Sequence, residues 1–503
     1  MRSFAGLLHF DGSAPDAALL RQLGETIRLR ASSAPAIAVD GEYGIATVEH
    51  RSDGDACPLP QWNGEFRFAR DPFGVRPFYY AHTRRGIVFS DGLEAVLAHP
   101  DVDAGELDER AVADYLAGGT CGDEEATIYA NVRRLPPAHE LTWRRGEAIG
   151  IRRYWSIPAP KRERARDAAV RLESALKDAI RDRVTGDAAV VFMSGGLDST
   201  TLAALTREVR PDTTLVAATS VYRTRIADVE EPFALEAARS IGIPIRVFPL
   251  DGYPPLHALE SGLWTPEPGP LLTASMTRDI YTACAELAPV ALHGHPADAL
   301  LSASLTKVLR GLPLARRVAA LVQYTLVRRR PPWFFLRDVF GVPRRPPPPA
   351  PPPRWLRAEP HDAADENALA LPMWSNLFEW AHPLQTRAPI ELVYPWCDVR
   401  VVEAALALEP IPWLVEKHVV RELLRGRVSE TIRRRRKSFL QGNPWKCALP
   451  EERALRIEAA ARFIDPERFA AACRAEGCLS DTTLRAVAFE SWLRNRPAAR
   501  KML

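Results

Sequence analysis

One segment, residues 188–200, constrains this chain more than any other. An apolar stretch, AAVVFM, leads directly into the turn SGGLDST. The two adjacent glycines let backbone N–H groups approach an anion without interference from a Cβ atom, and a helix that starts near Asp198 points the positive end of its dipole at the same place. The pattern therefore predicts a strand, an anion-binding turn and a helix. The residues expected to bind the anion are Ser194, Gly195, Gly196, Asp198, Ser199 and Thr200.

The type of turn limits the chemistry. The segment lacks the lysine of the GxxxxGK[ST] loop, so it does not predict transfer of a terminal phosphoryl group. It resembles instead the pyrophosphate loop of the ATP pyrophosphatases. That resemblance implies cleavage of ATP between its α- and β-phosphates, with AMP left on an oxygen of the substrate. A plain tight turn between a strand and a helix is the alternative interpretation.

Strand and helix patterns alternate after this turn. The strands are expected at 214–219, 245–249 and 290–293, and the helices at 198–209, 229–241 and 274–288. Such alternation predicts a parallel sheet with right-handed crossovers, in which ligands bind at the carboxyl ends of the strands. Adenine is then expected to contact the end of the second strand through backbone groups near Ala218 and Thr219.

The chain up to about residue 155 has a different pattern. Short strands punctuated by Asp-Gly and Pro pairs predict an antiparallel, strand-rich domain. Because single hydrophobic cores stop growing at about 250–300 residues, a chain of 503 residues is expected to hold at least two domains. We place the first at 1–158 and the second at 163–503, the second being a Rossmann-like α/β domain with a helical C-terminal part from 365 onward.

A second acidic turn follows the last predicted strand. Its sequence is HGHPAD, which contains Gly294 and ends at Asp298. Mg²⁺ bound to a polyphosphate takes one or two carboxylates and fills its remaining sites with phosphate oxygens and water. Asp198 and Asp298, each at the end of a parallel strand, would meet that need. His293 and His295 could ligate zinc, but no third ligand follows at a suitable spacing, so a role in the turn or in lining the substrate site is favoured.

The most basic short run of the chain is RRRRK at 433–437. Runs of this kind are typical of localisation signals or nucleic-acid patches. The net charge is only +3, however, so the chain as a whole does not suit a polyanion and we expect no nucleic-acid partner. Lys437 could instead bring positive charge to the α-phosphate as pyrophosphate leaves, or to the oxyanion that forms when an amine attacks the adenylate.

Residues 306–357 form a basic insertion that holds 12 Lys or Arg and a single acid, Asp338. It contains the cluster Trp333-Phe334-Phe335 and the proline run 346–353, which suits only polyproline-like or irregular structure. We expect most of the insertion to lie outside the catalytic sheet. Three uses fit it: docking of a partner, contact with an anionic membrane, or a passive connection between helices.

No segment predicts secretion or membrane insertion. The first apolar run meets Asp11 almost at once, and no uncharged apolar stretch approaches the roughly 20 residues that a membrane helix needs. Seven cysteines without a CxxC pair suit reduced thiols better than a disulfide framework. We expect a soluble, cytoplasmic protein.

Taken together, these motifs resemble the asparagine-synthetase superfamily over most of the chain. In that family a glutaminase-like domain of the N-terminal-nucleophile type precedes an ATP-dependent synthetase domain. The segments that carry the resemblance are RDPFGVRPFYY at 70–80, VRRLPPAH at 132–139, RYW at 153–155, SGGLDST at 194–200, GHPAD at 294–298, YPWCD at 394–398 and KHVVRE at 417–422. By the same alignment, Lys437 falls on the lysine assigned to adenylation and amide closure.

Two departures from the family pattern are informative. Family glutaminases start Met-Cys and use the cysteine as nucleophile, whereas this chain starts Met1-Arg2-Ser3, so we expect a degenerate domain without glutamine hydrolysis. Ala299 follows the turn residue Asp298, where asparagine synthetases carry an acid. Together with the basic insertion, these features look most like the lasso-peptide macrolactam synthetases.

That resemblance implies a function. An Asp or Glu side chain of a ribosomal precursor peptide would be adenylated with ATP and Mg²⁺, and the peptide's N-terminal amine would close a macrolactam through an isopeptide bond. Both reactants belong to one bound chain, so no ammonia source is needed. A leader-peptide protease or leader-binding protein is the implied partner. The alternative is a ligase of the β-lactam-synthetase or asparagine-synthetase type that acts on a free small molecule.

Overall fold

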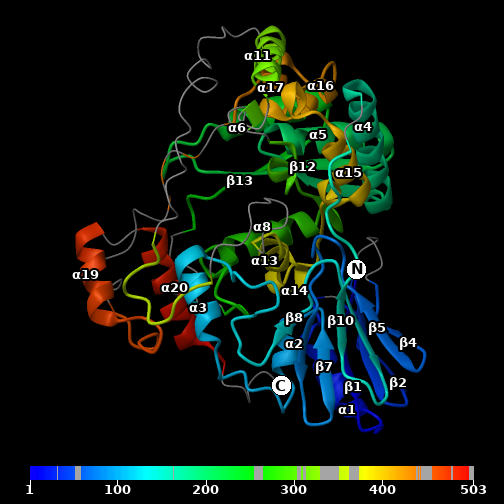
Figure 1. Ribbon diagram of the computed structural model, residues 1–503, viewed down its shortest axis with the longest axis vertical. Coiled ribbons are helices and arrows are strands. Elements are labelled where there is room, and N and C mark those ends of the chain that lie inside the picture. The colour runs from blue at the N-terminus through cyan, green and yellow to red at the C-terminus, as the bar shows by residue number, and fades with distance from the viewer. Residues whose placement is uncertain are drawn as a thin grey trace.

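In the computed structural model, an N-terminal region (residues 1–158) of antiparallel sheets lies below a C-terminal region (residues 164–503) that is built around a parallel sheet (Figure 1). The structure describes all residues except 31, 51–57, 162–163, 254–263, 303–307, 310–312, 329–350, 362–372, 438–439, 441, 443, 445–455, 477–479 and 498–503. Among the described residues, no helix combines the length and apolar character needed to cross a bilayer.

The N-terminal region is the predicted strand-rich unit, and its strands form two sheets. The larger sheet has the strand order β2 (Ala36–Asp40), β3 (Tyr43–Glu49), β1 (Arg2–His9), β7 (Gly86–Ser90), β6 (Tyr79–His82), β8 (Arg133–Arg134). The smaller sheet has the strand order β10 (Gly150–Arg153), β9 (His139–Arg144), β5 (Glu65–Ala69), β4 (Gln61–Trp62). Buried rings from both sheets form one aromatic core, with Phe4, Phe78 and Phe89 meeting Phe66 and Trp143. Helices α1 (Ala17–Thr26) and α2 (Leu93–Leu97) cover the opposite face of the larger sheet, so β1 is buried on both faces.

The C-terminal region contains the predicted parallel sheet. Its order is β13 (Ile245–Pro249), β12 (Thr214–Val221), β11 (Ala188–Phe192), β14 (Val290–Leu292), β15 (Glu391–Val393). The helices that follow or flank these strands are α4 (Ala165–Arg183), α5 (Leu197–Val209), α6 (Glu230–Ile241), α8 (Ala274–Ala285), α9 (Ala297–Leu301) and α15 (Val399–Ala407). The chain leaves β11 toward β12 on one side and returns to β14 on the other. That reversal opens a crevice at the carboxyl end of β11, where such sheets bind their ligands.

The alternation of strands and helices is confirmed, with one correction. The stretch from 365 onward was expected to be helical, but it also contributes β15, which pairs with β14 at the edge of the sheet. The strand has only three residues, and all three are buried. In a run of three residues, the spacing of apolar residues cannot distinguish a strand from a helix.

Four buried charged residues join the two regions. Arg70 donates to Glu379 at 3.0 Å, and Arg134 donates to the other carboxylate oxygen of Glu379 at 2.8 Å and to Glu267. All four side chains are at most 5% exposed. Removal of one partner would leave a buried charge without compensation, so this network fixes how the regions sit against each other.

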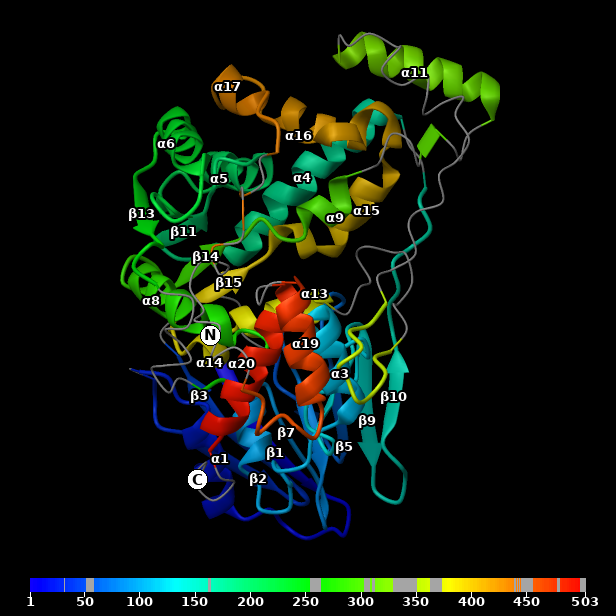
Figure 2. The same ribbon diagram turned by 90° about the vertical axis from the view of Figure 1, so that its left-hand side faces the viewer.

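The end of the chain returns to the N-terminal region. Helices α19 (Pro466–Glu476) and α20 (Asp481–Asn495) lie beside α3 (Glu109–Gly118), as Figures 1 and 2 show. Trp492 packs against Tyr129 with ring centroids 6.2 Å apart, and its indole N–H donates to the carbonyl of Thr265 at 2.7 Å. A single hydrophobic cluster therefore contains residues from both ends of the chain.

The basic insertion is partly helical and partly core. Helix α11 (Leu314–Arg328) packs in a small cluster of its own, outside the sheet, as expected. Trp355 also lies outside the parallel sheet, but it is part of a hydrophobic core: it is 4% exposed and packs edge-on against Phe469 at 5.4 Å. A large aromatic side chain gains more from burial than its basic neighbours lose. The cluster at 333–335 and most of the proline run lie outside the described residues.

Candidate active site

The glycine-rich turn lies at the carboxyl end of the central strand β11. Gly195 has a φ of +70°, and a Cβ atom there would lie 2.5 Å from the carbonyl carbon of Phe233 in α6, so only glycine fits. Gly196 precedes α5 and has no side chain that could cap the helix. The first backbone N–H groups of α5 are therefore available to an anion in the turn.

Two carboxylates and two lysines meet beside this turn. Asp198 lies in the first turn of α5, and Asp298 lies in the first turn of α9, which follows β14. The ammonium of Lys417 contacts Asp198 Oδ2 and lies 2.6 Å from Asp298 Oδ1. The ammonium of Lys437 lies 2.8 Å from Asp298 Oδ2. The fold thus brings together three residues that the sequence singles out, and it adds Lys417.

The two carboxylates differ in their electrostatic surroundings. Burial raises the pKa of Asp198, and Lys417 offsets only part of this effect. Burial also acts to raise the pKa of Asp298, but hydrogen bonds and attraction from Lys417 and Lys437 hold that pKa below its ordinary value. Asp298 is therefore the more strongly ionised partner in the folded protein.

The carboxylate pair fits Mg²⁺ that arrives with a polyphosphate. Asp198 Oδ1 is buried and has no hydrogen-bond partner among the described residues, so an oxygen is left over for a cation. No group of three His, Cys, Asp or Glu side chains in the described part of the chain could hold a metal by itself. One or two carboxylates suffice when phosphate oxygens and water complete the shell. Asp198 and Asp298 are the residues that would hold the ion.

Two cavities, each of about 430 Å³, open on either side of the turn. They share Ser194, Gly196, Asp198 and Asp298. The first, which we call the basic cavity, is lined besides by Leu197, Glu230, Ser302, Glu416, Lys417, Arg421, Arg435, Arg436 and Lys437. The second, the nucleoside cavity, is lined besides by Phe192, Met193, Ser199, Ala218, Thr219, Ser220, Met276, Thr277, Ile280, Tyr281, His293, Gly294 and His295. One cavity suits an anionic group and the other an aromatic base.

Lys417 is aimed by an unusual backbone. The sequence suggests one helix from 416 to 422, but Glu416 and Lys417 have φ values of 50° and 53°, and α16 (His418–Leu423) starts only after them. A left-handed backbone conformation at a non-glycine residue costs on the order of 1–3 kcal/mol, so it persists only where surrounding contacts hold it. Arg421 does so, because its guanidinium donates to the carbonyls of Glu416 at 3.0 Å and Arg435 at 2.9 Å.

The basic run 433–437 is not one patch, because its members serve different purposes. Arg433 and Arg434 pair with Glu430 at the surface. Arg435 is 8% exposed, donates to the carbonyl of Ser194 at 2.7 Å and lies 4.2 Å above the ring of Phe233, so it holds the anion-binding turn. Lys437 extends into the basic cavity.

The two histidines of the second turn stack on each other, with ring centroids 4.4 Å apart. Burial lowers the pKa of His293 to about 3, so this ring is neutral, and its Nδ1 accepts the backbone N–H of His295 at 3.2 Å. A Cβ atom at Gly294 would lie 3.3 Å from the backbone nitrogen of Ser199, which shows how closely the turn approaches α5. The pair therefore lines the nucleoside cavity and shapes the turn.

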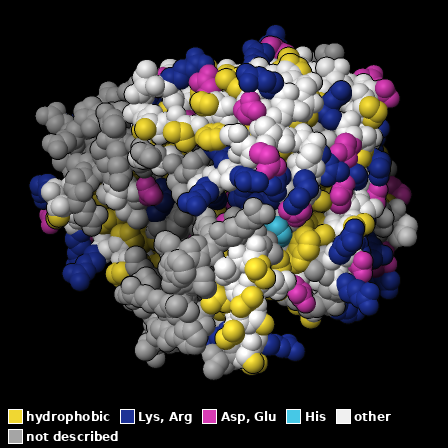
Figure 3. Space-filling model, turned by 90° about the horizontal axis from the view of Figure 1, so that it is seen from above, with side chains coloured by type: hydrophobic (Ala, Val, Ile, Leu, Met, Phe, Trp, Pro, Cys, Tyr) yellow, Lys and Arg dark blue, Asp and Glu magenta, His cyan; other side chains and the backbone are white. Residues whose placement is uncertain are grey.

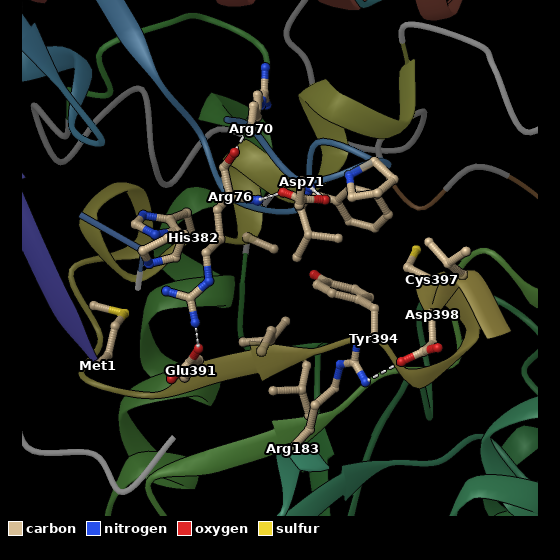
Figure 4. A pocket seen from close by; sticks show the side chains of 18 of the residues that line it. Met1, Arg70, Asp71, Arg76, Arg183, His382, Glu391, Tyr394, Cys397 and Asp398 are labelled. Atoms are coloured by element: carbon tan, nitrogen blue, oxygen red, sulfur yellow. Dashed lines mark hydrogen bonds and ion pairs between the residues drawn. The ribbon is translucent and has the colours of Figure 1, made fainter. Parts of the chain in front are cut away.

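A third cavity, of about 420 Å³, lies between the two regions (Figure 4). Its charged groups are paired: Arg76 donates to Glu391 at 2.5 Å, and Arg183 donates to Asp398 at 2.9 Å. We call it the inter-region cavity. It has no lining residue in common with the nucleoside cavity.

Aromatic rings from those two cavities contact one another. Tyr394 lies with its ring centroid 4.5 Å from that of Phe378 and 5.8 Å from that of His293. Phe378 and Tyr394 line the inter-region cavity, and His293 lines the nucleoside cavity. The contact between Tyr394 and His293 therefore joins the lining of one cavity to the lining of the other.

Most of the residues singled out in the sequence reach one of these cavities, and two do not. Gly195 shapes the turn without lining a cavity, and Thr200 is completely buried because α5 turns its side chain toward the interior. Sequence reasoning assigned no role to Lys417 or Arg435. The KHVVRE segment was the available signal for Lys417, whereas the contact of Arg435 with Ser194 joins positions 241 residues apart and leaves no local pattern.

Comparison with known families agrees with this architecture. Residues 171–494 match the asparagine synthase family model, and residues 60–155 match the glutamine amidotransferase domain model. The first match contains the anion-binding turn, both carboxylates and both lysines. The second contains Arg70, Arg134 and the four-stranded sheet.

Individual relatives match shorter stretches. The chain is 32% identical over 139 residues to asparagine synthetase [glutamine-hydrolyzing] 3 of Bacillus subtilis, a match that covers 27% of this chain and 22% of that protein. It is 27% identical over 187 residues to asparagine synthetase [glutamine-hydrolyzing] 1 of the same organism, a match that covers 34% of this chain and 28% of that protein. It thus spans about a quarter of the length of these curated relatives. NMN synthetase from Francisella tularensis, a solved structure, is similar at 11% identity and a TM-score of 0.25 over 66% of this chain and 95% of that one.

Proposed function

The chain belongs to the asparagine synthase family, and we propose that it is an ATP-dependent, AMP-forming ligase that closes a macrolactam in a ribosomal peptide. In this proposal residues 1–158 are a degenerate glutaminase-like domain and 163–503 the synthetase domain. The observation that carries it is the meeting of two carboxylates and two lysines between the basic and nucleoside cavities. That arrangement suits a nucleotide whose base and phosphates lie on opposite sides of one turn.

ATP would span both cavities. Its adenosine would lie in the nucleoside cavity against Ala218 and Thr219, and its β- and γ-phosphates on the turn and the N-terminus of α5. Mg²⁺ on Asp198 and Asp298 would neutralise phosphate charge. Lys417, whose ammonium lies between these carboxylates, would contribute its charge to the departing pyrophosphate.

The reaction would then proceed in two steps. A side-chain carboxylate oxygen of the peptide attacks the α-phosphorus of ATP, and the bond to the bridging oxygen breaks and releases pyrophosphate. The peptide's amine next attacks the acyl carbon, AMP leaves with the bonding electrons, and the amine gives up a proton. Lys437 would stabilise the negative charge that develops in both steps; its contact with Asp298 and its place in the lining of the basic cavity support this role.

Three observations favour an amine that belongs to the substrate over ammonia from glutamine. The inter-region cavity and the nucleoside cavity have no lining residue in common, and aromatic side chains line both. The thiol that lines the inter-region cavity in the described chain, Cys397, is buried, and burial raises its pKa well above the ordinary value, so it is a poor nucleophile. Arg2 points to the surface, where it pairs with Glu49.

A peptide is the substrate that best explains the departures from the family pattern. Ala299 stands where asparagine synthetases carry an acid, and the insertion 306–357 adds 12 basic residues that a free amino acid would not need. In this proposal the precursor peptide arrives with, or is trimmed by, a leader-binding protein or protease. The alternative is a ligase of the β-lactam-synthetase or asparagine-synthetase type, for which the substrate would be a free small molecule.

Co-expression of the chain with the short peptides encoded beside its gene tests the proposal. Mass spectrometry should find one peptide that has lost the mass of one water, and fragmentation should place the new bond between its N-terminus and an Asp or Glu side chain. The Lys437→Ala variant serves as the control and should leave the peptide linear. Unchanged peptides, together with consumption of ATP on a free amino acid, would replace the peptide by the small-molecule alternative.

A further inference from the structure

The inter-region cavity is a space that the proposed ligase reaction does not use. Its volume of about 420 Å³ lies within the range of roughly 300–1,000 Å³ that small-molecule sites occupy. Residues 68–72 of the N-terminal region line one part of it, and residues 391–394 of the C-terminal region line another (Figure 4). Apolar side chains make up much of its wall, among them Phe68, Val75, Phe378, Leu392 and Val399. Such a wall suits an organic molecule better than water, because each buried water needs about two to four polar partners.

The charged side chains of this cavity already have partners within the protein. Arg76 pairs with Glu391, and Arg183 pairs with Asp398. The other charged side chains of the lining are held by the buried network that joins the regions, by backbone N–H groups or by Asp398 as well. A charged ligand would have to displace one of these partners or lie without a counter-ion, and burial of an unpaired charge is costly. The cavity therefore favours an uncharged ligand.

Two further titratable side chains of the lining are neutral. Burial lowers the pKa of His382 to about 3, so its imidazole ring is not protonated at neutral pH. Burial raises the pKa of the Cys397 thiol well above its ordinary value, so this group keeps its proton. Neither side chain adds a charge that could attract an ionic ligand.

Tyr394 offers the cavity a hydrogen bond that the protein does not use. Its side chain is only 5% exposed, and in Figure 4 its hydroxyl points into the cavity with no interaction drawn to it. In the described part of the chain this hydroxyl has no hydrogen-bond partner. Burial raises the pKa of Tyr394 well above its ordinary value, so the oxygen keeps its proton and can donate it. A ligand that accepts this hydrogen bond would recover the free energy that a buried, unpaired hydroxyl costs.

We propose that the inter-region cavity binds a small uncharged molecule with an apolar body and a carbonyl group, to which the Tyr394 hydroxyl donates. The apolar wall would cover the body of this ligand, and the paired charges would remain as they are. A free amino acid does not fit, because it brings two charges to a cavity whose own charges are already paired. The proposal does not rest on the ligase function, since the inter-region cavity shares no lining residue with the basic cavity or the nucleoside cavity.

Three probes that share one phenyl body test the preference for an uncharged ligand. They are phenylacetamide, phenylacetate and phenylethylamine, of which the last two are charged at neutral pH. An NMR titration of the full-length protein should give the amide a dissociation constant at least tenfold lower than that of either ion. Equal affinities for the three probes would overturn the proposal. Failure of the amide to bind up to its solubility limit would leave the cavity to water and would also overturn it.

A variant must show that the amide binds in this cavity and not at the surface. Lys and Arg side chains are spread over the face that Figure 3 shows, and such side chains can also attract a carbonyl group weakly. Tyr394→Phe keeps the ring and removes the hydroxyl, so it should weaken binding of phenylacetamide at least fivefold. Tyr80→Phe is the matched control, because Tyr80 is 6% exposed and does not line the cavity, and it should leave the affinity unchanged. An affinity that Tyr394→Phe does not alter would contradict the assignment.

Denaturant unfolding gives the same variant a second readout. Because the Tyr394 hydroxyl has no partner in the described part of the chain, Tyr394→Phe should unfold at the same denaturant concentration as the parent protein. Tyr129→Phe removes a hydroxyl that donates to the carbonyl of Pro266 at 2.7 Å, so it should unfold at a lower concentration. If both variants lose stability alike, the Tyr394 hydroxyl serves the fold and the proposal fails.

Glutamine separates this site from a retained glutamine site. As a zwitterion it should not displace phenylacetamide from the protein in a competition titration. Displacement by glutamine would assign the cavity to an amino acid and overturn the proposal. None of these measurements needs ATP or a peptide substrate, so their outcome is independent of the ligase assay.

Discussion

The inter-region cavity and the site around the anion-binding turn both contain basic and acidic side chains. They differ in how completely these charged groups are paired within the protein. In the inter-region cavity, Arg76 and Arg183 each bond a carboxylate of their own. Beside the turn, Lys417 divides its charge between two carboxylates, and Asp198 keeps a buried oxygen without a partner. One set of charges is complete within the protein, and the other is completed only by a ligand.

This difference separates structural from chemical roles among motif residues. Arg70 and Arg134 belong to the segments that resemble the glutaminase-like half of the family, yet their guanidinium groups are buried in the network that joins the two regions. Asp198 and Asp298 belong to equally clear motifs and face a cavity. Both sets of motif residues therefore predict the fold. Whether a charged motif residue is buried in an ion pair or faces a cavity indicates whether it takes part in chemistry.

The largest effect on stability should come from Glu379→Ala. The substitution leaves Arg70 and Arg134 buried without their shared partner, so the free energy of unfolding should fall by about 3–5 kcal/mol. Denaturant unfolding measures it. Glu109→Ala, which breaks an exposed pair with Arg462, is the control and should change little. Equal small losses in both variants would show that the network does not join the regions.

The two carboxylates proposed to hold Mg²⁺ should affect activity much more than stability. Asp198→Asn and Asp298→Asn should each lower ATP–pyrophosphate exchange at least 100-fold, since loss of such a charge-stabilising group costs on the order of 3 kcal/mol. Stability without ATP should not fall for Asp198→Asn, because burial already opposes ionisation of this carboxyl. Asp178→Asn, at an exposed acid of α4, is the control. If Asp198→Asn or Asp298→Asn exchanges pyrophosphate at the rate of the parent protein, that residue does not hold the Mg²⁺ ion.

Lys437→Arg should cost less. An ammonium is a compact point charge that the broader guanidinium does not replace, so product formation should fall about 30-fold, or about 2 kcal/mol. Arg434→Lys, an exposed member of the same run that pairs with Glu430, should leave the rate unchanged. If Lys437→Arg remains as active as the parent, the run acts only as a basic patch.

An effect of similar size, on pH dependence, is expected in the N-terminal region. Burial raises the pKa of Asp91 to about 7, while the unfolded chain titrates near 4. The folded protein binds the extra proton between these values, so this contribution to stability is present at low pH and is lost as pH rises from about 4 to 7. The unfolding free energy of the parent relative to Asp91→Asn should therefore fall by about 2–3 kcal/mol between pH 5 and pH 8. A difference that does not vary with pH would show that Asp91 titrates normally.

The smallest expected signal is that of glutamine hydrolysis. With Cys397 buried and Arg2 paired at the surface, the inter-region cavity offers no ionised thiol among its described lining residues. Glutamate release from glutamine should not exceed that of heat-treated protein, and Cys397→Ala should not alter it. Release above that background would show that another group has taken the nucleophile's place.

The sequence predicts the sheet well because its signals are local. Strand β11, its turn and α5 each leave a contiguous pattern, and the observed bounds of 197–209 and 245–249 fall within a residue of those expected. Asp198 and Asp298 could be placed together because strands of one parallel sheet end at the same edge.

What the sequence does not predict depends on contacts between distant parts of the chain. The left-handed turn at Glu416 and Lys417 is held by Arg421, which donates to the carbonyl of Glu416 in the turn and to that of the distant Arg435, and no single-residue preference favours it. The burial of Trp355 depends on Phe469, more than a hundred residues away. Short β15 carries no periodic signal, since three buried residues fit a strand and a helix equally well.

The central claim is that the site beside the turn activates a carboxylate with the α-phosphate of ATP. Oxygen-18 placed in the Asp or Glu side chain of the substrate peptide tests it most directly. The proposed reaction transfers one labelled oxygen to AMP, because the attacking carboxylate oxygen leaves with the nucleotide when the amine closes the ring. Labelled AMP together with unlabelled pyrophosphate is the predicted result. Label in inorganic phosphate, with ADP as the nucleotide product, would contradict it.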